Sequence, residues 1–218
     1  MVVMITGASG GIGRATAEFF LARGHKVHGL DINGSSLVHE NYTHHIADVT
    51  DPATFTEGIL PEILINNAGI QEGARDIDVN LRGVINVTEH YAIGSSRIRS
   101  VVNIGSASGH TGSEFPEYAA SKGGVLAYTK NAALRLAPNA TCNSIDPGGV
   151  TTELNRCVIE DKELWDRIME LTPLKRWASP EEIAEWIYFV AVNNRFMTGQ
   201  NLLIDGGEAG RAEFIWPE

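Results

Sequence analysis

Residues 2–13 read VVMITGASGGIG, a short apolar run followed by a glycine-rich turn and the start of an amphipathic helical pattern. Glycines at positions 7, 11 and 13 allow a tight turn, close approach of a pyrophosphate and close packing of the helix on the strand. Their spacing, G-x-x-x-G-x-G, differs from the commoner G-x-G-x-x-G, and a glycine run alone also fits a simple turn. Because this run lies between a strand and a helix, we interpret it as a dinucleotide-binding turn.

Apolar runs alternate with amphipathic segments along the rest of the chain. Strands are expected at Val2–Ile5, Lys26–Leu30, His44–Ala47, Ile63–Ile65, Ser100–Ile104, Thr141–Ile145 and Asn201–Ile204. Helices are expected at Ile12–Arg23, Asp78–Ala92, Glu117–Leu136, Lys162–Leu171 and Pro180–Val192. This pattern predicts an α/β fold, a Rossmann-like, doubly wound parallel sheet of about seven strands with helices on both faces. No linker or repeat divides the chain, so we expect one domain over residues 1–218.

Several element boundaries can be predicted from local residues. Ser179 followed by Pro180 and two glutamates is typical of a helix start, and Gly24 is expected to end the first helix in the left-handed conformation. The segments Ile32–Thr43 and Asp51–Leu60 have little room for full helices. The second and third crossovers are therefore expected to be abbreviated.

The composition limits the partners of this chain. With 17 basic and 27 acidic residues the net charge is −10, which argues against a nucleic-acid partner but not against a dinucleotide bound by backbone N–H groups. No apolar stretch approaches the length of a membrane span, and the seven histidines lack metal-ligand spacing. The two cysteines, Cys142 and Cys157, form no disulfide framework, and the N-terminus does not resemble a signal peptide. A cytoplasmic protein without a metal site is expected.

Asp31 ends the second apolar run, about twenty residues beyond the glycine turn. An acid at this position can hydrogen-bond the adenosine ribose hydroxyls and repels the additional phosphate of NADP. No lysine or arginine stands at Ser9, Gly10 or Ile32 to bind that phosphate. The alternative is an aspartate that caps a loop, and we favour selection of NAD over NADP.

Further segments complete a family pattern. They are Asn66-Asn67-Ala68-Gly69, Asp78-Val79-Asn80-Leu81, Asn103-Ile104-Gly105-Ser106, Tyr118-Ala119-Ala120-Ser121-Lys122, Pro147-Gly148-Gly149-Val150-Thr151-Thr152, and Thr198-Gly199-Gln200 leading to Leu203-Ile204-Asp205-Gly206-Gly207. With the glycine turn, these segments occur in the order typical of short-chain dehydrogenases/reductases. The sequence resembles the single-domain members of this family, with shortened crossovers, over nearly its whole length.

The resemblance implies an NAD-dependent oxidoreductase that transfers a hydride between nicotinamide and a secondary alcohol or ketone. It assigns the catalytic roles to Asn80, Ser106, Tyr118 and Lys122, with Tyr118 as the general acid/base. It also implies the cofactor-binding residues Gly7, Ser9, Gly10, Gly11, Ile12, Gly13, Asp31, Asp48, Val49, Asn66, Ala68, Gly69, Tyr118, Lys122, Pro147, Gly148, Val150 and Thr152. For Asp48 the simpler reading, an aspartate in a turn at a strand end, is compatible with the same role.

These residue types suit the implied chemistry. A tyrosine hydroxyl is a poor base at neutral pH, but Tyr118 and Lys122 stand four residues apart on one predicted helix face, and an ammonium or the positive nicotinamide ring stabilises the phenolate. Ser106 follows a buried strand, where its hydroxyl can donate to a developing negative charge. No G-x-S-x-G surrounds Ser106, so we reject a nucleophilic serine hydrolase. His110 is treated as a loop residue for which a substrate contact is conceivable.

Other functions remain as alternatives at this point. A catalytically silent NAD-binding regulatory or scaffolding module would not need the complete set of Asn80, Ser106, Tyr118 and Lys122. An epimerase or dehydratase of the extended relatives normally carries a sizeable carboxyl-terminal substrate region, and little chain follows Asp205.

Departures from the family pattern affect the expected pocket. The stretches Gly7–Asn66 and Asn67–Asn80 are shorter than usual, so we expect an open substrate mouth. We expect residues 152–175, an amphipathic segment, to be a mobile cover over the substrate. The resemblance implies a homodimer or homotetramer. Small residues on the Tyr118 helix would allow the close helix approach that such an assembly needs, and they fit packing against the cofactor or the sheet equally well.

Overall fold

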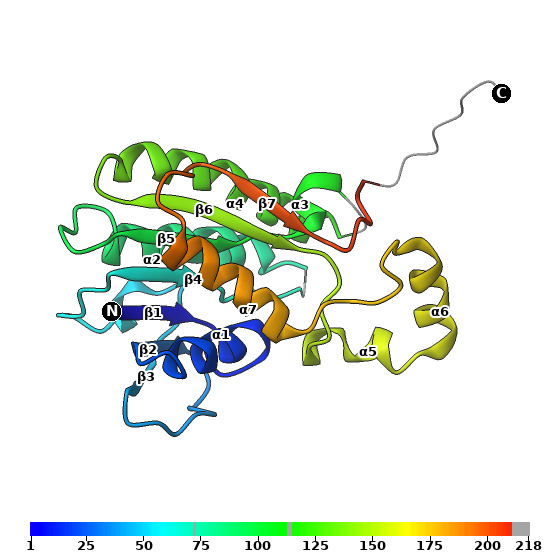
Figure 1. The fold of residues 1–218 in the computed structure, drawn as a ribbon, viewed down its shortest axis with the longest axis horizontal. Helices are drawn as coiled ribbons and strands as arrows, with labels where there is room; N and C mark the ends of the chain where they lie inside the picture. Colours follow the sequence, from blue (N-terminus) through cyan, green and yellow to red (C-terminus); the bar gives the residue numbers. More distant parts are fainter. Residues whose placement is uncertain (72, 113–114, 211–218) are drawn as a thin grey trace.

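The computed structural model describes residues 1–71, 73–112 and 115–210. These residues form a seven-stranded sheet in the order β3-β2-β1-β4-β5-β6-β7, and every neighbouring pair of strands is parallel (Figure 1). The strands are β1 Val2–Thr6, β2 Lys26–Asp31, β3 Tyr42–Ile46, β4 Ile63–Asn66, β5 Ser100–Ile104, β6 Thr141–Pro147 and β7 Asn201–Ile204. The predicted doubly wound α/β fold is confirmed.

Two layers of helices cover the sheet, and α7 lies beside α1 across the near face in Figure 1. One apolar cluster joins α1 and α7 to the sheet and contains Val3 and Ile5, whereas a second joins α2 and α4 to the other face and contains Met4. Successive side chains of a strand point to opposite faces, so β1 contributes to both cores. The helices are α1 Gly11–Leu21, α2 Gly83–Tyr91, α3 Ala107–Thr111, α4 Pro116–Leu136, α5 Arg156–Ile159, α6 Lys162–Leu171 and α7 Pro180–Tyr188.

The predicted helix start at Ser179 is confirmed in detail. The Ser179 hydroxyl accepts from the Glu182 amide, the Glu182 carboxylate accepts from the Ser179 amide, and Pro180 occupies the first helical position. A π-helical segment, Phe189–Asn193, extends α7. Gly24 has the expected positive φ of 75°, but α1 already ends at Leu21.

The second and third crossovers are abbreviated, as predicted. No helix forms in residues 32–41, all of which are described, and the next crossover contains only the 3₁₀ turn Pro52–Thr54. The predicted bounds of the third strand were wrong, because β3 begins at Tyr42 and ends at Ile46. Pairing with β2 sets this register, with Val27 opposite Tyr42. Because this edge strand contains polar residues, its start is not marked by an apolar run in the sequence.

The chain order reverses between β1 and β4. Strands β1, β2 and β3 extend the sheet in one direction, and β4 to β7 extend it in the other. In such sheets ligands bind beside the carboxyl ends of the strands at this switch point. The glycine turn follows β1 directly, Asp31 ends β2, and Ser106 comes two residues after β5. The fold therefore gathers the predicted site residues along one edge of the sheet.

Residues 152–175 extend beyond the sheet as a flap that contains α5 and α6 (Figure 1). Within α6, whose ten residues are all described, no residue is buried. Its partly exposed apolar residues include Leu164, Trp165, Ile168 and Met169. Trp165 makes an edge contact with Trp177, with ring centroids 5.0 Å apart.

Candidate active site

The glycine turn after β1 is so closely packed that side chains are excluded at two positions. Gly7 has a φ of 65°, and a Cβ placed there would lie 2.8 Å from the Asn67 side chain and 2.9 Å from the Ala68 backbone. A Cβ on Gly13 would overlap the Gly7 carbonyl oxygen. Gly10 is the N-cap of α1 and no side chain caps this helix. The amides of the first turn thus remain available to an anion.

Thr6 and Asn67 connect the glycine turn to the loop after β4, and the predicted site left both out. The Thr6 hydroxyl accepts from the amides of Asn67 and Ala68, each at 3.0 Å. The Asn67 side-chain amide donates to the carbonyls of Thr6 and Gly7 at 3.0 and 3.1 Å. Their positions beside the glycines were visible in the sequence, but these bonds join residues about sixty positions apart.

Asp31 lies against the glycine turn, as the ribose-binding hypothesis requires. Its Oδ2 accepts from the Ser9 amide at 3.0 Å, and its Oδ1 accepts from the backbone and side-chain nitrogens of Asn33 at 2.9 and 3.2 Å. Ser9 Oγ also donates to the Gly34 carbonyl, and Ser36 Oγ donates to the Ser9 carbonyl. The loop after β2 is therefore closed onto the turn, and the Asp31 carboxylate is held between them.

Strand β3 supports this loop from the outside. His44 Nε2 lies 2.8 Å from the Asn33 carbonyl and its Nδ1 lies 2.9 Å from the Tyr42 hydroxyl. Since a carbonyl only accepts, neutral His44 carries its proton on Nε2 and Tyr42 donates to Nδ1. Burial raises the pKa of Tyr42, which keeps that donor protonated.

Asp48 and Val49 follow β3 closely. Asp48 Oδ1 accepts from the amide and hydroxyl of Thr50 at 2.8 and 2.7 Å, and these bonds lower the pKa of Asp48. Buried Val49 packs against Gly83, where an added Cβ would lie 2.6 Å from Val49 Cγ2. Asp48 forms the turn that its simpler reading expected, and a cofactor role stays a prediction.

Asn66 and Ala68 lie where the loop after β4 leaves the sheet. Buried Asn66 donates to Thr88 Oγ1 at 2.9 Å and to Asn103 Oδ1 at 2.8 Å, so it joins β4 to α2 and β5. Both residues lie in the same closely packed region as Thr6, Val49, Gly83 and Val84.

Tyr118 and Lys122 lie on one face of α4, near the end of β5. Lys122 is 5 % exposed, and its Nζ donates to the Ile104 carbonyl at 2.9 Å. The same nitrogen lies 5.7 Å from the centre of the Tyr118 ring. The ammonium is thus anchored to the strand that precedes Ser106 and faces the tyrosine, as the helical spacing predicted.

Asn80 lies in the π-helical segment Ile77–Arg82 and is fully buried. Its amide nitrogen donates to the Ile70 carbonyl at 2.8 Å and to Ser121 Oγ at 3.1 Å, and its oxygen accepts from the Ile70 amide. A Cβ on Gly69 would lie 3.2 Å from Asn80 Oδ1 and 3.5 Å from Lys122 Nζ. Both polar groups therefore border Gly69.

Ser106 is the N-cap of α3, and its Oγ accepts from the Ser108 amide at 3.2 Å. Only 8 % of the residue is exposed. As a hydroxyl it retains its proton for donation to a second oxygen. His110, taken as a loop residue, instead belongs to α3, and its contact with Asp146 was not foreseen.

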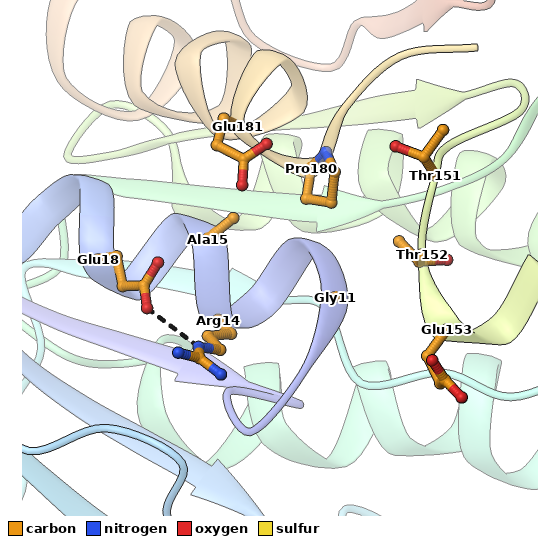
Figure 2. Close-up of a pocket in the computed structure, with 9 residues that line it drawn as sticks. All are labelled: Gly11, Arg14, Ala15, Glu18, Thr151, Thr152, Glu153, Pro180 and Glu181. Atoms are coloured by element: carbon orange, nitrogen blue, oxygen red, sulfur yellow. Dashed lines mark hydrogen bonds and ion pairs between the residues drawn. The ribbon is translucent and has the colours of Figure 1, made fainter.

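The segment from Pro147 to Thr152 brings the end of β6 to the glycine turn. The Gly148 amide donates to the Ile204 carbonyl at 3.0 Å, and Val150 is 3 % exposed. A Cβ on Gly11 would lie 3.4 Å from Thr152 Cγ2. Gly11 and Thr152 also line a cleft of about 350 Å³ between α1, α7 and residues 151–153, shown in Figure 2. This cleft lies at the root of the flap and does not include Ser106, Tyr118 or Lys122.

The sequence is similar to those of known reductases. Residues 7–208 match the family model described as enoyl-(acyl carrier protein) reductase. The chain is 35 % identical to the 3-oxoacyl-(acyl-carrier-protein) reductase FabG of Thermotoga maritima over 240 residues, covering 94 % of this chain and 96 % of the relative. The chain belongs to the short-chain dehydrogenases/reductases.

Solved structures of short-chain dehydrogenases/reductases have the same fold. The ligand-free aldohexose dehydrogenase of Thermoplasma acidophilum superposes with a TM-score of 0.89 at 33 % identity, covering 100 % of this chain and 97 % of that structure. A 4-hydroxyisoleucine dehydrogenase complexed with NADH gives a TM-score of 0.90 at 32 % identity, covering 97 % of this chain and 99 % of that structure. This chain is therefore an oxidoreductase of a family that includes nicotinamide-dependent enzymes.

Two other features are absent from the described residues. Among the residues that the structure describes, no group of three or more His, Cys, Asp or Glu side chains is arranged to hold a metal ion. None of the helices in the same residues is both long and apolar enough to cross a bilayer.

Proposed function

We propose that this protein is an NAD-dependent oxidoreductase that interconverts a secondary alcohol and a ketone, with Tyr118 as the general acid/base. The observation that carries the proposal is the placement of Lys122 Nζ, 2.9 Å from the Ile104 carbonyl and 5.7 Å from the Tyr118 ring. Ser106 follows the same strand by two residues. The ammonium thus lies beside the tyrosine ring at the carboxyl end of β5, the strand that Ser106 follows.

Each residue has a role that follows from its chemistry. When bound, NAD supplies the hydride acceptor. The Tyr118 phenolate takes the hydroxyl proton of the alcohol, and the Lys122 ammonium stabilises that phenolate. Ser106 donates a hydrogen bond to the substrate oxygen. Asn80 joins the Ile70 backbone to Ser121 on α4 and so holds this helix against the loop beside Lys122.

The residues around the glycine turn fit a dinucleotide. The excluded Cβ positions at Gly7 and Gly13 and the uncapped start of α1 suit a pyrophosphate. We assign its contacts to Ser9, Gly10, Gly11 and Ile12, with Gly69, Pro147, Gly148, Val150 and Thr152 toward the nicotinamide. Asp48 and Val49 are assigned to the adenine.

Selection of NAD over NADP is attributed to Asp31 and its loop. The carboxylate would meet the ribose hydroxyls and repel a phosphate. The hydrogen bonds from Ser9 and Asn33 hold this charge in place, and the closed loop occupies the adjacent space. The relatives include both cofactors, because the 4-hydroxyisoleucine dehydrogenase structure contains NADH and a similar structure from Agrobacterium tumefaciens contains NADP. The proposed selection of NAD therefore rests on Asp31 and its loop alone.

The substrate is proposed only by class. The relatives are named for 3-oxoacyl thioesters, aldohexoses and a hydroxylated amino acid, which all present a secondary alcohol, a hemiacetal or a ketone. We propose that residues 152–175 cover the substrate, because the apolar residues of α6 are only partly covered. We also propose a single catalytic domain, a homodimer or homotetramer, and a cytoplasmic location, where the free thiols of Cys142 and Cys157 would stay reduced.

The test measures turnover of a panel of candidate substrates by the change in absorbance of the nicotinamide cofactor. Aldohexoses, aliphatic hydroxy-amino acids and sugar acids would be offered with NAD and NADP, and 3-oxoacyl thioesters with NADH and NADPH. Turnover that requires Tyr118 and prefers NAD(H) supports the proposal. Tight NADH binding by calorimetry without turnover on any member of the panel would instead indicate a silent nucleotide-binding module.

A further inference from the structure

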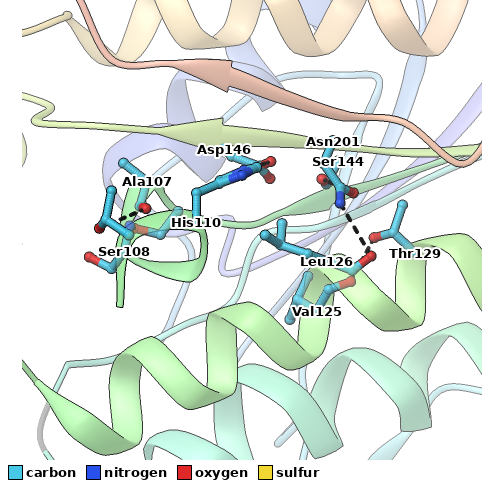
Figure 3. Close-up of polar contacts among 11 residues, drawn as sticks. Ala107, Ser108, His110, Val125, Leu126, Thr129, Ser144, Asp146 and Asn201 are labelled. Carbon is cyan, nitrogen blue, oxygen red and sulfur yellow. Dashed lines mark hydrogen bonds and ion pairs between the residues drawn. The ribbon is translucent and has the colours of Figure 1, made fainter. Parts of the chain in front are cut away.

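A buried carboxylate lies directly behind the turn that carries Ser106. Asp146, the penultimate residue of β6, has 0 % of its surface exposed. Its Oδ2 lies 2.7 Å from His110 Nε2, whereas Oδ1 has no hydrogen-bond partner among the residues that the structure describes. Figure 3 shows the His110 side chain reaching from α3 toward this carboxylate. A buried charge of this kind requires compensation, and His110 is its closest donor.

The backbone on both sides of Ser106 leaves room for this pair. A Cβ on Gly105 would overlap Asp146 Oδ1 and would lie 3.0 Å from Leu126 Cδ2. A Cβ on Gly109 would lie 2.9 Å from the Lys122 carbonyl carbon. Residues 105 and 109 therefore accept only glycine without displacement of Asp146 or α4. The turn of Ser106 is seated between the buried carboxylate and the helix of Tyr118.

The pair also joins the elements that carry the proposed catalytic groups. His110 is the fourth residue of α3, whose N-cap is Ser106. Asp146 immediately precedes Pro147, where the proposed nicotinamide segment begins. Lys122 Nζ bonds to the Ile104 carbonyl, one residue before Gly105. One hydrogen bond between residues 36 positions apart thus connects the serine turn with the nicotinamide segment.

The strength of the hydrogen bond between His110 and Asp146 depends on whether the Asp146 carboxyl is ionised. Burial raises the pKa of Asp146, while the contact with His110, the nearby Ser144 and the charge of Lys122 act in the opposite direction. These groups face the carboxylate from α3, β6 and α4, and Asp205 packs against Gly148 from beyond β7. When Asp146 takes up a proton at low pH, the charge-assisted bond to His110 weakens.

We propose that His110 and Asp146 are positioning residues that hold the Ser106 hydroxyl in register with the nicotinamide segment. This inference rests on the proposed function, because Ser106 is given there the role of donor to the substrate oxygen. The ionised carboxylate binds Nε2–H of His110 and prevents α3 from moving along β6. A displacement of the donor by about 1 Å is enough to reduce a catalytic rate by about a hundredfold.

The experiment compares His110→Phe with a matched control, His90→Phe. His90 also pairs with an acid, Glu57 at 3.7 Å, and its side chain is 26 % exposed compared with 30 % for His110. Asp146→Asn removes the charge but retains an oxygen that can accept from Nε2–H. The probes are a 3-oxoacyl thioester with NADH and D-glucose with NAD.

For His110→Phe we expect kcat to fall about tenfold at neutral pH, with the Kd for NADH changed less than about twofold. Asp146→Asn should lose about threefold at neutral pH. Its pH profile should lack the decrease of kcat that we expect in the wild-type protein when Asp146 is protonated. The double variant should be no slower than His110→Phe, because the two residues act through one bond. His90→Phe should retain the wild-type rate and pH profile.

A folded His110→Phe protein with the rate and pH profile of His90→Phe would overturn the inference. If the wild-type protein turns over neither probe nor any member of the wider panel, the proposed function fails, and amide exchange at Ser108 and Gly109 decides whether the pair positions this turn. About tenfold faster exchange there in His110→Phe, and not in His90→Phe, supports the positioning role. Unchanged exchange contradicts it.

Discussion

The proposed catalytic corner, which consists of Asn80, Ser106, Tyr118 and Lys122, differs from the flap in how deeply its residues are buried. Asn80, Ser106 and Lys122 are 0, 8 and 5 % exposed, and each bonds to a different strand or helix. In the flap, Leu154, Leu171 and Leu174 are more than half exposed, and no residue of α6, which is described throughout, is buried. These three buried residues cannot move without disturbing their neighbours, whereas the exposed residues of the flap can adapt.

This difference explains why the reaction class can be inferred more readily than the substrate. The proposed catalytic residues Tyr118, Lys122 and Ser106 carry a phenol, an ammonium and a hydroxyl, and these groups together suit one kind of proton transfer. The flap contacts other parts of the chain near Leu174, whose amide donates to the Gly206 carbonyl at 3.2 Å, and through Trp165, whose ring centroid lies 5.0 Å from that of Trp177. The arrangement of the apolar residues of the flap would depend on the substrate that they cover, so it does not indicate which substrate that is.

The largest expected effect lies in the corner. Tyr118→Phe removes the exchanging proton and should reduce kcat by about a thousandfold, with the Kd for NADH measured by fluorescence changed less than about twofold. Tyr128→Phe, on the same helix but bonded to Glu89, is the control and should retain activity. Substantial turnover by Tyr118→Phe would end the proposed mechanism.

The glycine turn should be nearly as sensitive. Gly13→Ala places a Cβ against the Gly7 carbonyl and should destabilise the protein by about 1–3 kcal/mol and weaken NADH binding about a hundredfold. Gly10→Ala meets no atom within 4 Å and serves as the stability control. Equal Tm values for the two variants would show that the turn is less rigid than the structure indicates.

Replacing Asp31 tests cofactor selection. Asp31→Ala should weaken NAD about tenfold and lower the NAD-to-NADP affinity ratio by at least about tenfold, because it removes both an acceptor and a repelling charge. Titration calorimetry with each dinucleotide measures this ratio, and Asp51→Ala, an exposed aspartate, provides the control. An unchanged ratio would assign selection to another residue.

A smaller effect, of a different kind, is expected in the flap. Trp165→Ala should raise the KM of the best substrate about threefold to tenfold, while kcat and Tm change little, because the residue covers substrate and supports no core. Trp186→Ala, another partly exposed tryptophan, is the control. A loss of kcat equal to that in a corner variant would abolish the distinction between the two regions.

The smallest effect concerns the start of α7, where the chain returns from the flap. The Arg176 guanidinium and the Ser179 amide lower the pKa of Glu182 to about 2. A lowered carboxylate pKa stabilises the fold above pH 4.5, and this contribution is lost as the pH falls toward 2. Because the side chain is 44 % exposed, Glu182→Gln should cost only about 0.5–1 kcal/mol at pH 7 and nothing at pH 2. Urea denaturation at both pH values measures the difference.

Much of the fold and of the candidate site was predictable because the relevant signals are local. The alternation of runs located all seven strands, and Ser179-Pro180 located the start of α7, since caps and turns depend on neighbouring residues. The spacing of Tyr118 and Lys122 predicted a shared helix face, which the 5.7 Å approach confirms. The start of β3 was missed because its partner strand, and not its own hydrophobicity, sets it.

By itself, the sequence determined the order of strands and helices, the glycine turn and the residue types available for chemistry. Only the tertiary structure decided that Asp146 meets His110, that Lys122 is anchored on Ile104, and that the loop after β2 closes on Ser9. Turns and helix starts depend on residues a few positions apart, whereas these contacts join different strands and helices. They form only when packing of the sheet and helices brings distant parts of the chain together.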